Sequence, residues 1–390
     1  MELARREAPR RLPATILLLG LASLFTDVGT EMIFPLLPIF LVETLGAGPD
    51  YLGLVEGAAD TVASLLKLVA GIAADRSRGR KGYVVSGYAL ASAARPLVAL
   101  ATRPWHVLTV RVADRIGKGI RGAPRDALIA DAAGDRAGYA FGFNQAMDHV
   151  GAVFGPLVAT SLVALHWPLR RVFFVAVIPG LLATVLVWRV REPPRQRPTP
   201  SSAARRSVLR LGRSLWAYLG ILAVFSLGNS SDAFLLLRAR SLGVSTGAIP
   251  VLWAVLNLSK VLWAHLGGRA ADRAPMPAVI AGGWGVYALV YLGLGRAQAA
   301  WQVWALFVLY GVFYGLTEPV EKALVRDLVR ADQRGAAYGA YNFVVGVAAL
   351  PAGVLTGSIW RAWGAQAALS VGAGLSALAC VLLVAWSARR

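Results

Sequence analysis

Cysteine, histidine and charged residues are all scarce in this chain of 390 residues. The single cysteine, Cys380, cannot form an internal disulfide bond, and the four histidines are scattered without the spacing of metal ligands. Only 16% of the residues are charged, which is less than a soluble domain usually carries. The sequence therefore predicts neither a disulfide-stabilised fold nor a metal site, and it argues against a soluble protein.

Apolar residues make up 57% of the chain, and the mean hydropathy is +0.58. They gather in runs of about 20 residues or more, which is the length that an α-helix needs to cross a bilayer. We therefore expect an all-α membrane protein in contact with the lipid bilayer. Twelve transmembrane helices are expected between breaks rich in glycine and proline, at about residues 14–42, 51–74, 82–102, 105–131, 137–165, 170–190, 215–242, 248–267, 277–296, 301–328, 336–360 and 364–387.

Lysine and arginine together number 40, against 21 acidic residues, which gives a formal net charge of +19. Most of these cations fall in alternate connections between the expected helices, which is the pattern of cytoplasmic loops. We therefore interpret the excess as a topology signal and not as nucleic-acid binding. The pattern predicts a multi-pass protein of a bacterial-type inner (plasma) membrane, with an uncleaved first helix and both termini in the cytoplasm. We expect a monomer.

The chain divides into two similar halves. Residues 71–76 (GIAADR) recur as residues 268–273 (GRAADR), and residues 124–126 (PRD) are echoed by residues 319–321 (PVE). Repeats of this kind are typical of membrane folds built from two related halves. The expected units are an N-terminal six-helix bundle at residues 1–190, a basic cytoplasmic linker at residues 191–214 and a C-terminal six-helix bundle at residues 215–390.

The fourth expected helix carries an unusual number of charges. At about 100° per residue, its ionisable side chains between residues 111 and 126 share one face of the helix. A charge at the centre of a membrane costs roughly 2.5–3.5 kcal/mol on insertion scales, so this face cannot look at lipid. It must face partner acids, a water-filled cavity or the cytoplasm. The residues are Arg111, Asp114, Arg115, Lys118, Arg121, Arg125 and Asp126.

Four carboxyl groups are candidates for proton coupling: Asp27, Glu31, Asp60 and Asp148. Asp27 and Glu31 lie one turn apart on one face of the first helix. Burial disfavours a carboxylate and a nearby arginine favours it, so such a group can take up a proton on one side of a membrane and release it on the other. The alternative is a structural network in which these acids only neutralise the basic face of the fourth helix.

The basic face also has two interpretations. The cations that lie deepest in the fourth helix are Arg111, Arg115 and Lys118. They either neutralise the acids or bind an anionic group of a substrate, since arginine forms bidentate pairs with carboxylate and phosphate. Arg121 approaches the cytoplasmic end of this helix and is interpreted as part of a solvated or gating helix end. In the second half, Asp232 and Glu318 are the best candidates to line a substrate cavity.

Three motifs resemble those of the major facilitator superfamily, and the resemblance covers essentially the whole chain. Residues 71–81 (GIAADRSRGRK) are similar to its signature between helices two and three. Residues 108–117 resemble its fourth-helix motif, with Asp114 and Arg115 in place of the usual Gln and Gly, and residues 151–156 resemble its antiporter-associated fifth-helix motif. The resemblance implies two pseudo-symmetric six-helix bundles around a central cavity, which rock to give alternating access.

The same resemblance implies a gating role for charged residues at the mouths of two cytoplasmic loops. In that family, such residues lock the state that is closed to the cytoplasm. The positive N-terminal end of a helix that begins near residue 336 can receive one of these carboxylates. A topology signal alone is the alternative interpretation. The residues concerned are Asp75, Arg76, Asp272 and Arg273.

We therefore expect a proton-coupled secondary active transporter and not an enzyme. It would export a small amphipathic organic solute or drug in exchange for protons, and the solute and protons are its expected partners. No ATP-binding motif occurs, so we expect no cofactor. The first alternative is a carrier of an anionic metabolite or lipid headgroup, and the second is a metal-ion carrier that uses Asp27, Glu31 and Asp148. A scaffold without transport activity is the third.

Overall fold

The structure is a computed structural model, and it describes residues 13–77, 79–133, 136–192, 211–271, 273–330 and 333–389. These residues form helices and no strand. The first half contains α1 (Ala14–Ile33), η1 (Phe34–Leu36), α2 (Leu37–Ile39), η2 (Phe40–Thr44), α3 (Pro49–Arg76), α4 (Lys81–Ala94), η3 (Arg95–Leu100), α5 (Pro104–Ala133), α6 (Ala137–Ala164), α7 (Leu169–Val175) and α8 (Val177–Trp188). The second half contains α10 (Arg213–Gly228), α11 (Asp232–Ser241), α12 (Ile249–Ala271), α13 (Met276–Arg296), α14 (Ala300–Asp327) and α15 (Arg334–Ser387).

Breaks in these helices follow from local sequence. Pro35 and Pro38 lack the N–H that a regular helix needs, and α1 continues there as the short turns η1, α2 and η2. In the second half, α10 ends at Gly228, and the Ser231 side chain accepts a hydrogen bond from the backbone N–H of Ala233 to start α11. The second break places Ser231 and the two polar residues before it along the wall of a cavity between the two halves.

Nine helices in the described part of the chain are long and apolar enough to cross a membrane. The longest, α15, has 54 residues, and a φ of 85° at Gly364 interrupts it. At about 1.5 Å per residue, α15 far exceeds a hydrocarbon core of about 30 Å, so we treat it as two segments that meet at Gly364, next to the predicted gap between residues 360 and 364. The charged helix α5 is not among the nine. The prediction of an all-helical membrane fold is confirmed, and the number of twelve crossings stays a prediction.

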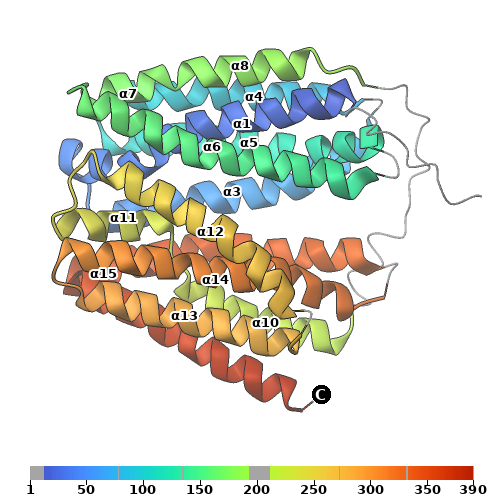
Figure 1. The fold of residues 1–390 in the computed structure, drawn as a ribbon, viewed down its shortest axis with the longest axis vertical. Coiled ribbons are helices and arrows are strands. Elements are labelled where there is room, and N and C mark those ends of the chain that lie inside the picture. Colours follow the sequence, from blue (N-terminus) through green and yellow to red (C-terminus); the bar gives the residue numbers. More distant parts are fainter. Residues whose placement is uncertain are drawn as a thin grey trace, which may run out of the picture.

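The helices of each half pack mainly against one another. In the first half, α1 contacts α6 and α8, α3 contacts α5, and α4 contacts α5 and α8; in the second, α12 contacts α14, and α10 and α13 contact α15. The first-half helices form the upper layer of Figure 1 and the second-half helices form the lower layer. Between the layers, α6 contacts α12, and α3 contacts α15 back to back at Gly53 and Gly353.

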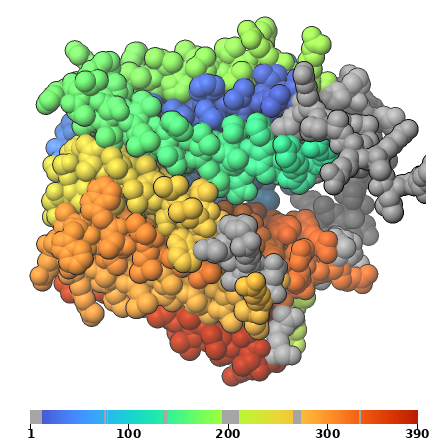
Figure 2. Space-filling view, viewed as in Figure 1, coloured from blue at the N-terminus to red at the C-terminus, as the bar shows by residue number. Residues whose placement is uncertain are grey.

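At one end, ion pairs also join the two layers. There, Arg240 donates hydrogen bonds to Glu43 at 2.7 and 3.2 Å, and Arg361 donates one to Asp50 at 2.7 Å. Figure 2 shows α12 against α6 toward this end and a hollow between the layers at the other. Large apolar side chains such as Trp188 are exposed on the outer surface, where lipid would cover them. The predicted linker falls largely outside the described residues.

Candidate functional site

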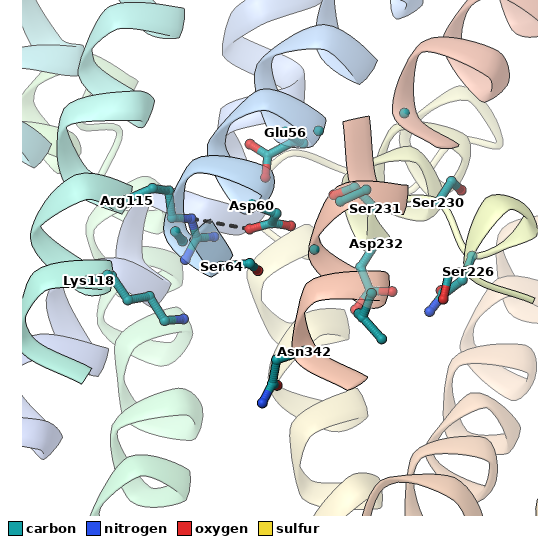
Figure 3. A pocket seen from close by; sticks show the side chains of 18 of the residues that line it. Glu56, Asp60, Ser64, Arg115, Lys118, Ser226, Ser230, Ser231, Asp232 and Asn342 are labelled. Carbon is teal, nitrogen blue, oxygen red and sulfur yellow. Dashed lines mark ion pairs between the residues drawn. The ribbon is translucent and has the colours of Figure 1, made fainter. Parts of the chain in front are cut away.

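Two adjoining cavities lie between the layers. The larger has a volume of about 430 Å³ and is lined by residues of α3, α5, α10, α11, α14 and α15. The smaller, of about 290 Å³, is lined mainly by α1, α5, α11 and α12. Both are lined by Phe34, Arg115, Lys118 and Asp232. Figure 3 shows Arg115 and Lys118 on the α5 side of the larger cavity and Asp232 on the opposite side. Three of the five predicted cavity residues, Arg115, Lys118 and Asp232, therefore line the same cavity from the two halves.

The charged face of α5 points inward, as predicted, and part of it is locked by ion pairs. Arg111 donates from Nε and Nη2 to both oxygens of Glu56, at 3.0 and 2.6 Å. Asp114 accepts from Arg95 Nε at 2.6 Å, and all four side chains are buried. Bidentate, charge-assisted pairs of this kind are the strongest hydrogen bonds that side chains make. Arg111 lines neither of the two cavities, so its geometry favours the structural interpretation over substrate binding.

Three other cations on this face keep free donors. Arg115 Nε lies 3.4 Å from Asp60 Oδ1 but makes no hydrogen bond with it. Arg121 is buried, its guanidinium stands 4.2 Å from the centre of the Tyr88 ring, and it reaches Thr26 Oγ1 at 3.4 Å. Within the described residues, neither Arg121 nor Lys118 has a carboxylate within 4.0 Å, and both line the smaller cavity.

The two acids of α1 also line the smaller cavity, and they differ in their contacts. Glu31 accepts a hydrogen bond from Trp253 Nε1 of α12 at 2.5 Å, which links the two halves. Asp27 is half-buried and has no hydrogen bond or ion pair in the described part of the chain. Among the predicted proton-coupling residues that line a cavity, Asp27 is thus the least constrained.

Two glycines bring α6 against α1 next to these acids. A Cβ atom at Gly151 would lie 2.6 Å from the carbonyl oxygen of Leu24 and 2.9 Å from Asp27 Cβ. A Cβ atom at Gly155 would lie 2.6 Å from the carbonyl oxygen of Val28 and 2.9 Å from Glu31 Cβ. The antiporter-like motif therefore sets the position of the helix that carries both candidate proton sites.

In the second half, Asp232 is held by aromatic hydroxyl groups. Tyr310 and Tyr314 donate to its two oxygens at 2.9 and 2.8 Å, and Lys260 Nζ lies 3.6 Å from Oδ2. The same ammonium group stands 3.6 Å from the centre of the Tyr314 ring and 5.0 Å from that of Trp253. Asp232 therefore lines the cavity with both carboxylate oxygens hydrogen-bonded and with Lys260 as its counter-charge.

Several predicted residues lie elsewhere. Asp148 accepts a hydrogen bond from Asn144 at 3.3 Å and lines neither cavity. Glu318 is exposed, lies outside both linings and contacts Lys322 at 3.4 Å. Of the four predicted gating residues, Arg273 is exposed, and the side chains of the other three, Asp75, Arg76 and Asp272, lie outside the described residues.

Sequence reasoning missed Arg95 and misplaced Arg121. Arg95 is a single cation before a proline in an apolar run, and such a residue usually marks a buried partner, so the signal was present. Arg121 looked like part of a solvated helix end, yet its side chain is buried against Tyr88. In the part of the chain that the structure describes, no three His, Cys, Asp or Glu side chains come together as a metal site, so the acids of the metal-carrier alternative are not assembled.

Long apolar helices packed around a charged internal cavity define a membrane transport protein. The sequence profile of the Major Facilitator Superfamily matches residues 19–266. An uncharacterised MFS-type transporter of Methanocaldococcus jannaschii is 31% identical over 365 residues, which cover 91% of this chain and 90% of the relative. The chain therefore belongs to the major facilitator superfamily. It is a transporter and not an enzyme, and the resemblance seen in its motifs is confirmed.

Two further likenesses are more distant. The multidrug resistance protein MdtH of Cronobacter sakazakii is 25% identical over 321 residues, which cover 81% of this chain and 79% of MdtH. The crystal structure of a variant of the nucleoside transporter NupG superposes with a TM-score of 0.83 at 12% identity, over 95% of this chain and 99% of that one. The NupG likeness establishes the fold and leaves the substrate open.

Proposed function

We propose that this protein is a proton-coupled secondary active transporter that exports a small organic solute in exchange for protons. It would be a monomer in a bacterial-type plasma membrane, with twelve crossings in two six-helix bundles and both termini in the cytoplasm. The packing of α1–α8 and of α10–α15 as separate layers supports the two bundles. On this topology, the hollow of Figure 2 opens toward the cytoplasm.

The position of Asp27 in the smaller cavity is the observation that supports the proposal most directly. Asp27 lines this cavity without an ionic partner in the described part of the chain, whereas Glu56 is fixed in a buried pair. A carboxyl group without an ionic partner can gain or lose a proton without breaking an ion pair. Opening the cavity to either side of the membrane changes the solvation of this carboxyl group and therefore its affinity for the proton. Glu31 would be the second proton site, because its hydrogen bond to Trp253 forms or breaks as the halves move.

Two observations favour export. The contact of Gly151 and Gly155 with α1 couples the antiporter-like motif to both acids. The relative MdtH carries the printed name of a multidrug resistance protein. A solute that occupies the carboxylates and a proton that neutralises them would compete, and competition of this kind is what couples the two fluxes in opposite directions.

Alternating access requires that the closed end open. The pairs of Glu43 with Arg240 and of Asp50 with Arg361 join the two layers there and are partly exposed. Exposed pairs are worth about 0–1 kcal/mol each, so they can close this end without locking it.

Proton movement in proteoliposomes tests the proposal. The purified protein is reconstituted with a pH-sensitive dye inside, and cationic, neutral, zwitterionic and anionic organic solutes are added in turn. We expect one class to evoke proton flux, Asp27→Asn to abolish it, and Asp327→Asn, which removes a carboxylate outside both cavities, to preserve it. Solute uptake without proton movement in the unmodified protein would overturn proton coupling.

A further inference from the structure

The lining of the smaller cavity restricts what kind of solute fits. Nine of its thirteen lining residues are ionisable, and only Phe34 and Trp253 offer an aromatic surface. A lipophilic drug would have to strip water from these charges without replacing its hydrogen bonds, which is unfavourable. The cavity is also at the small end of the range of about 300–1,000 Å³ that small-molecule sites occupy. The composition favours a small and strongly polar solute.

Internal ion pairs account for most of these charges. Arg95 neutralises Asp114, and Lys260 neutralises Asp232. Asp60, on the wall of the larger cavity, lies 3.4 Å from Arg115. The charges that remain without an ion pair in the described residues decide which ligand charges the site can hold.

The remaining charges have both signs. Lys118 and Arg121 remain on α5, and Asp27 and Glu31 remain on α1, all lining the same cavity. Arg121 is 5% exposed and has no carboxylate within 4.0 Å in the described part of the chain. Its buried positive charge is therefore available to pair with an anionic group of a ligand. Lys118 is close enough to Asp27 for their charges to interact. Cations on α5 and carboxylates on α1 line the same cavity, and together they match a ligand with two opposite charges.

We propose that the solute is a small zwitterion with an anionic group and a protonated amine. Lys118 and Arg121 bind the anionic group, and Arg115, whose Nε has no hydrogen bond, supplies a further donor. Asp27 and Glu31 bind the ammonium group. This inference rests on the proposed function and extends it, because an ammonium group bound to the carboxylates of Asp27 and Glu31 competes with protons for them. An anion without an amine would instead bind best when these two carboxyl groups are protonated.

A matched set of solutes separates these charges. The test uses a mixture of free amino acids and dipeptides, the same mixture with amidated carboxyl groups, and the same mixture with acetylated amino groups. Proton flux is read in proteoliposomes of phosphatidylglycerol. We expect the free zwitterions to evoke flux at concentrations about tenfold or more below those of either derivative, since a charge-assisted contact is lost in each. A zwitterionic lipid headgroup has the same chemistry, and flux evoked by added phosphatidylethanolamine alone would assign the charge pair to a lipid.

Variants then locate the anionic group. Lys118→Gln should remove the preference for free over amidated solutes and keep the response to the amidated mixture, and Lys118→Arg should restore the preference. Lys322→Gln, which removes an exposed lysine outside both cavities, should behave as the unmodified protein. Flux evoked best by the amidated mixture would overturn the zwitterion and leave proton-coupled export standing. Flux evoked best by the acetylated mixture, or by none of the three, would also overturn it, and absence of solute-evoked proton flux with every solute class would overturn the proposed function itself.

Discussion

The two halves of the molecule stabilise buried acids in different ways. In the first half, a carboxylate meets a guanidinium: Glu56 pairs with Arg111 and Asp114 pairs with Arg95, with all four side chains buried. Such pairs need both charges, because either one alone would be buried without compensation. These two buried ion pairs therefore form a charged network on the first-half side of the cavity.

In the second half, acids meet aromatic donors. Glu321 is buried and accepts from Trp284 Nε1 at 3.0 Å and from the Tyr341 hydroxyl group at 2.7 Å. Asp232 similarly accepts from two tyrosines, and Lys260 lies 3.6 Å from it as well. Indole and hydroxyl groups are neutral donors, and they bind a carboxyl oxygen whether or not the other oxygen carries a proton. Glu321 can thus be held without a fixed charge, whereas the two paired acids of the first half cannot.

Glu56→Gln should produce the largest effect. It leaves Arg111 buried without a carboxylate partner at Glu56, and breaking a buried pair costs about 3–5 kcal/mol. We expect a large fall in the apparent melting temperature of the detergent-solubilised protein. Glu43→Gln is the control, since it breaks the same chemistry at a partly exposed pair with Arg240 and should cost about 0–1 kcal/mol. Equal falls in melting temperature for the two variants would show that the buried pair stabilises the fold no more than the exposed pair does.

Gly155→Ala should come next. The added methyl group would lie 2.6 Å from the carbonyl oxygen of Val28, so α1 and α6 must separate, and overpacking of this kind costs about 1–3 kcal/mol. We expect lower stability and a loss of proton-coupled flux, because α1 carries Asp27 and Glu31. Gly142→Ala lies on the same helix with open space around it and should change neither. Full flux in Gly155→Ala would show that the close contact does not position the acids.

Sequence periodicity was enough to predict the helical fold and the inward direction of the charged face. The ranges of α13 (Met276–Arg296) and α6 (Ala137–Ala164) lie within a residue of those predicted, because proline and glycine mark their ends. The face of α5 had to point inward because lipid cannot solvate it. These conclusions need only local spacing and the cost of burying charge.

Pairing could not be predicted in the same way. Arg111 and Lys118 share a helix face, yet one is fixed by Glu56 of α3 and the other is free in the cavity. The choice depends on how α3 and α5 are packed, which no single helix records. Glycine spacing shows the same limit. The Gly-x-x-x-Gly pair of α6 lies against α1, whereas Gly335 and Gly339, with the same spacing, have no described neighbour closer than 3.7 Å to an added Cβ atom.

Tyr314→Phe tests the aromatic side of the comparison. It removes one hydroxyl donor from Asp232 and leaves Tyr310 and Lys260 in place. The net value of one hydrogen bond is about 1 kcal/mol, so we expect a modest fall in melting temperature. Tyr338→Phe, which removes an exposed hydroxyl group from α15, is the control. A loss as large as that of Glu56→Gln would mean that Asp232 depends on its tyrosines as the first-half acids depend on arginine.

Glu321→Gln should have the smallest effect of the four. The amide oxygen can still accept from Trp284, and the Tyr341 hydroxyl group can rotate to accept from the amide nitrogen. No cation within 4.0 Å loses a partner among the described residues, so we expect a change in unfolding free energy below about 1 kcal/mol. Titration with sodium dodecyl sulfate measures the unfolding free energies of Glu321→Gln and Glu56→Gln under the same conditions. A cost of the same size at both positions would show that Glu321 must be a charged carboxylate, and the contrast between an ionic half and an aromatic half would then fail at its most buried second-half acid.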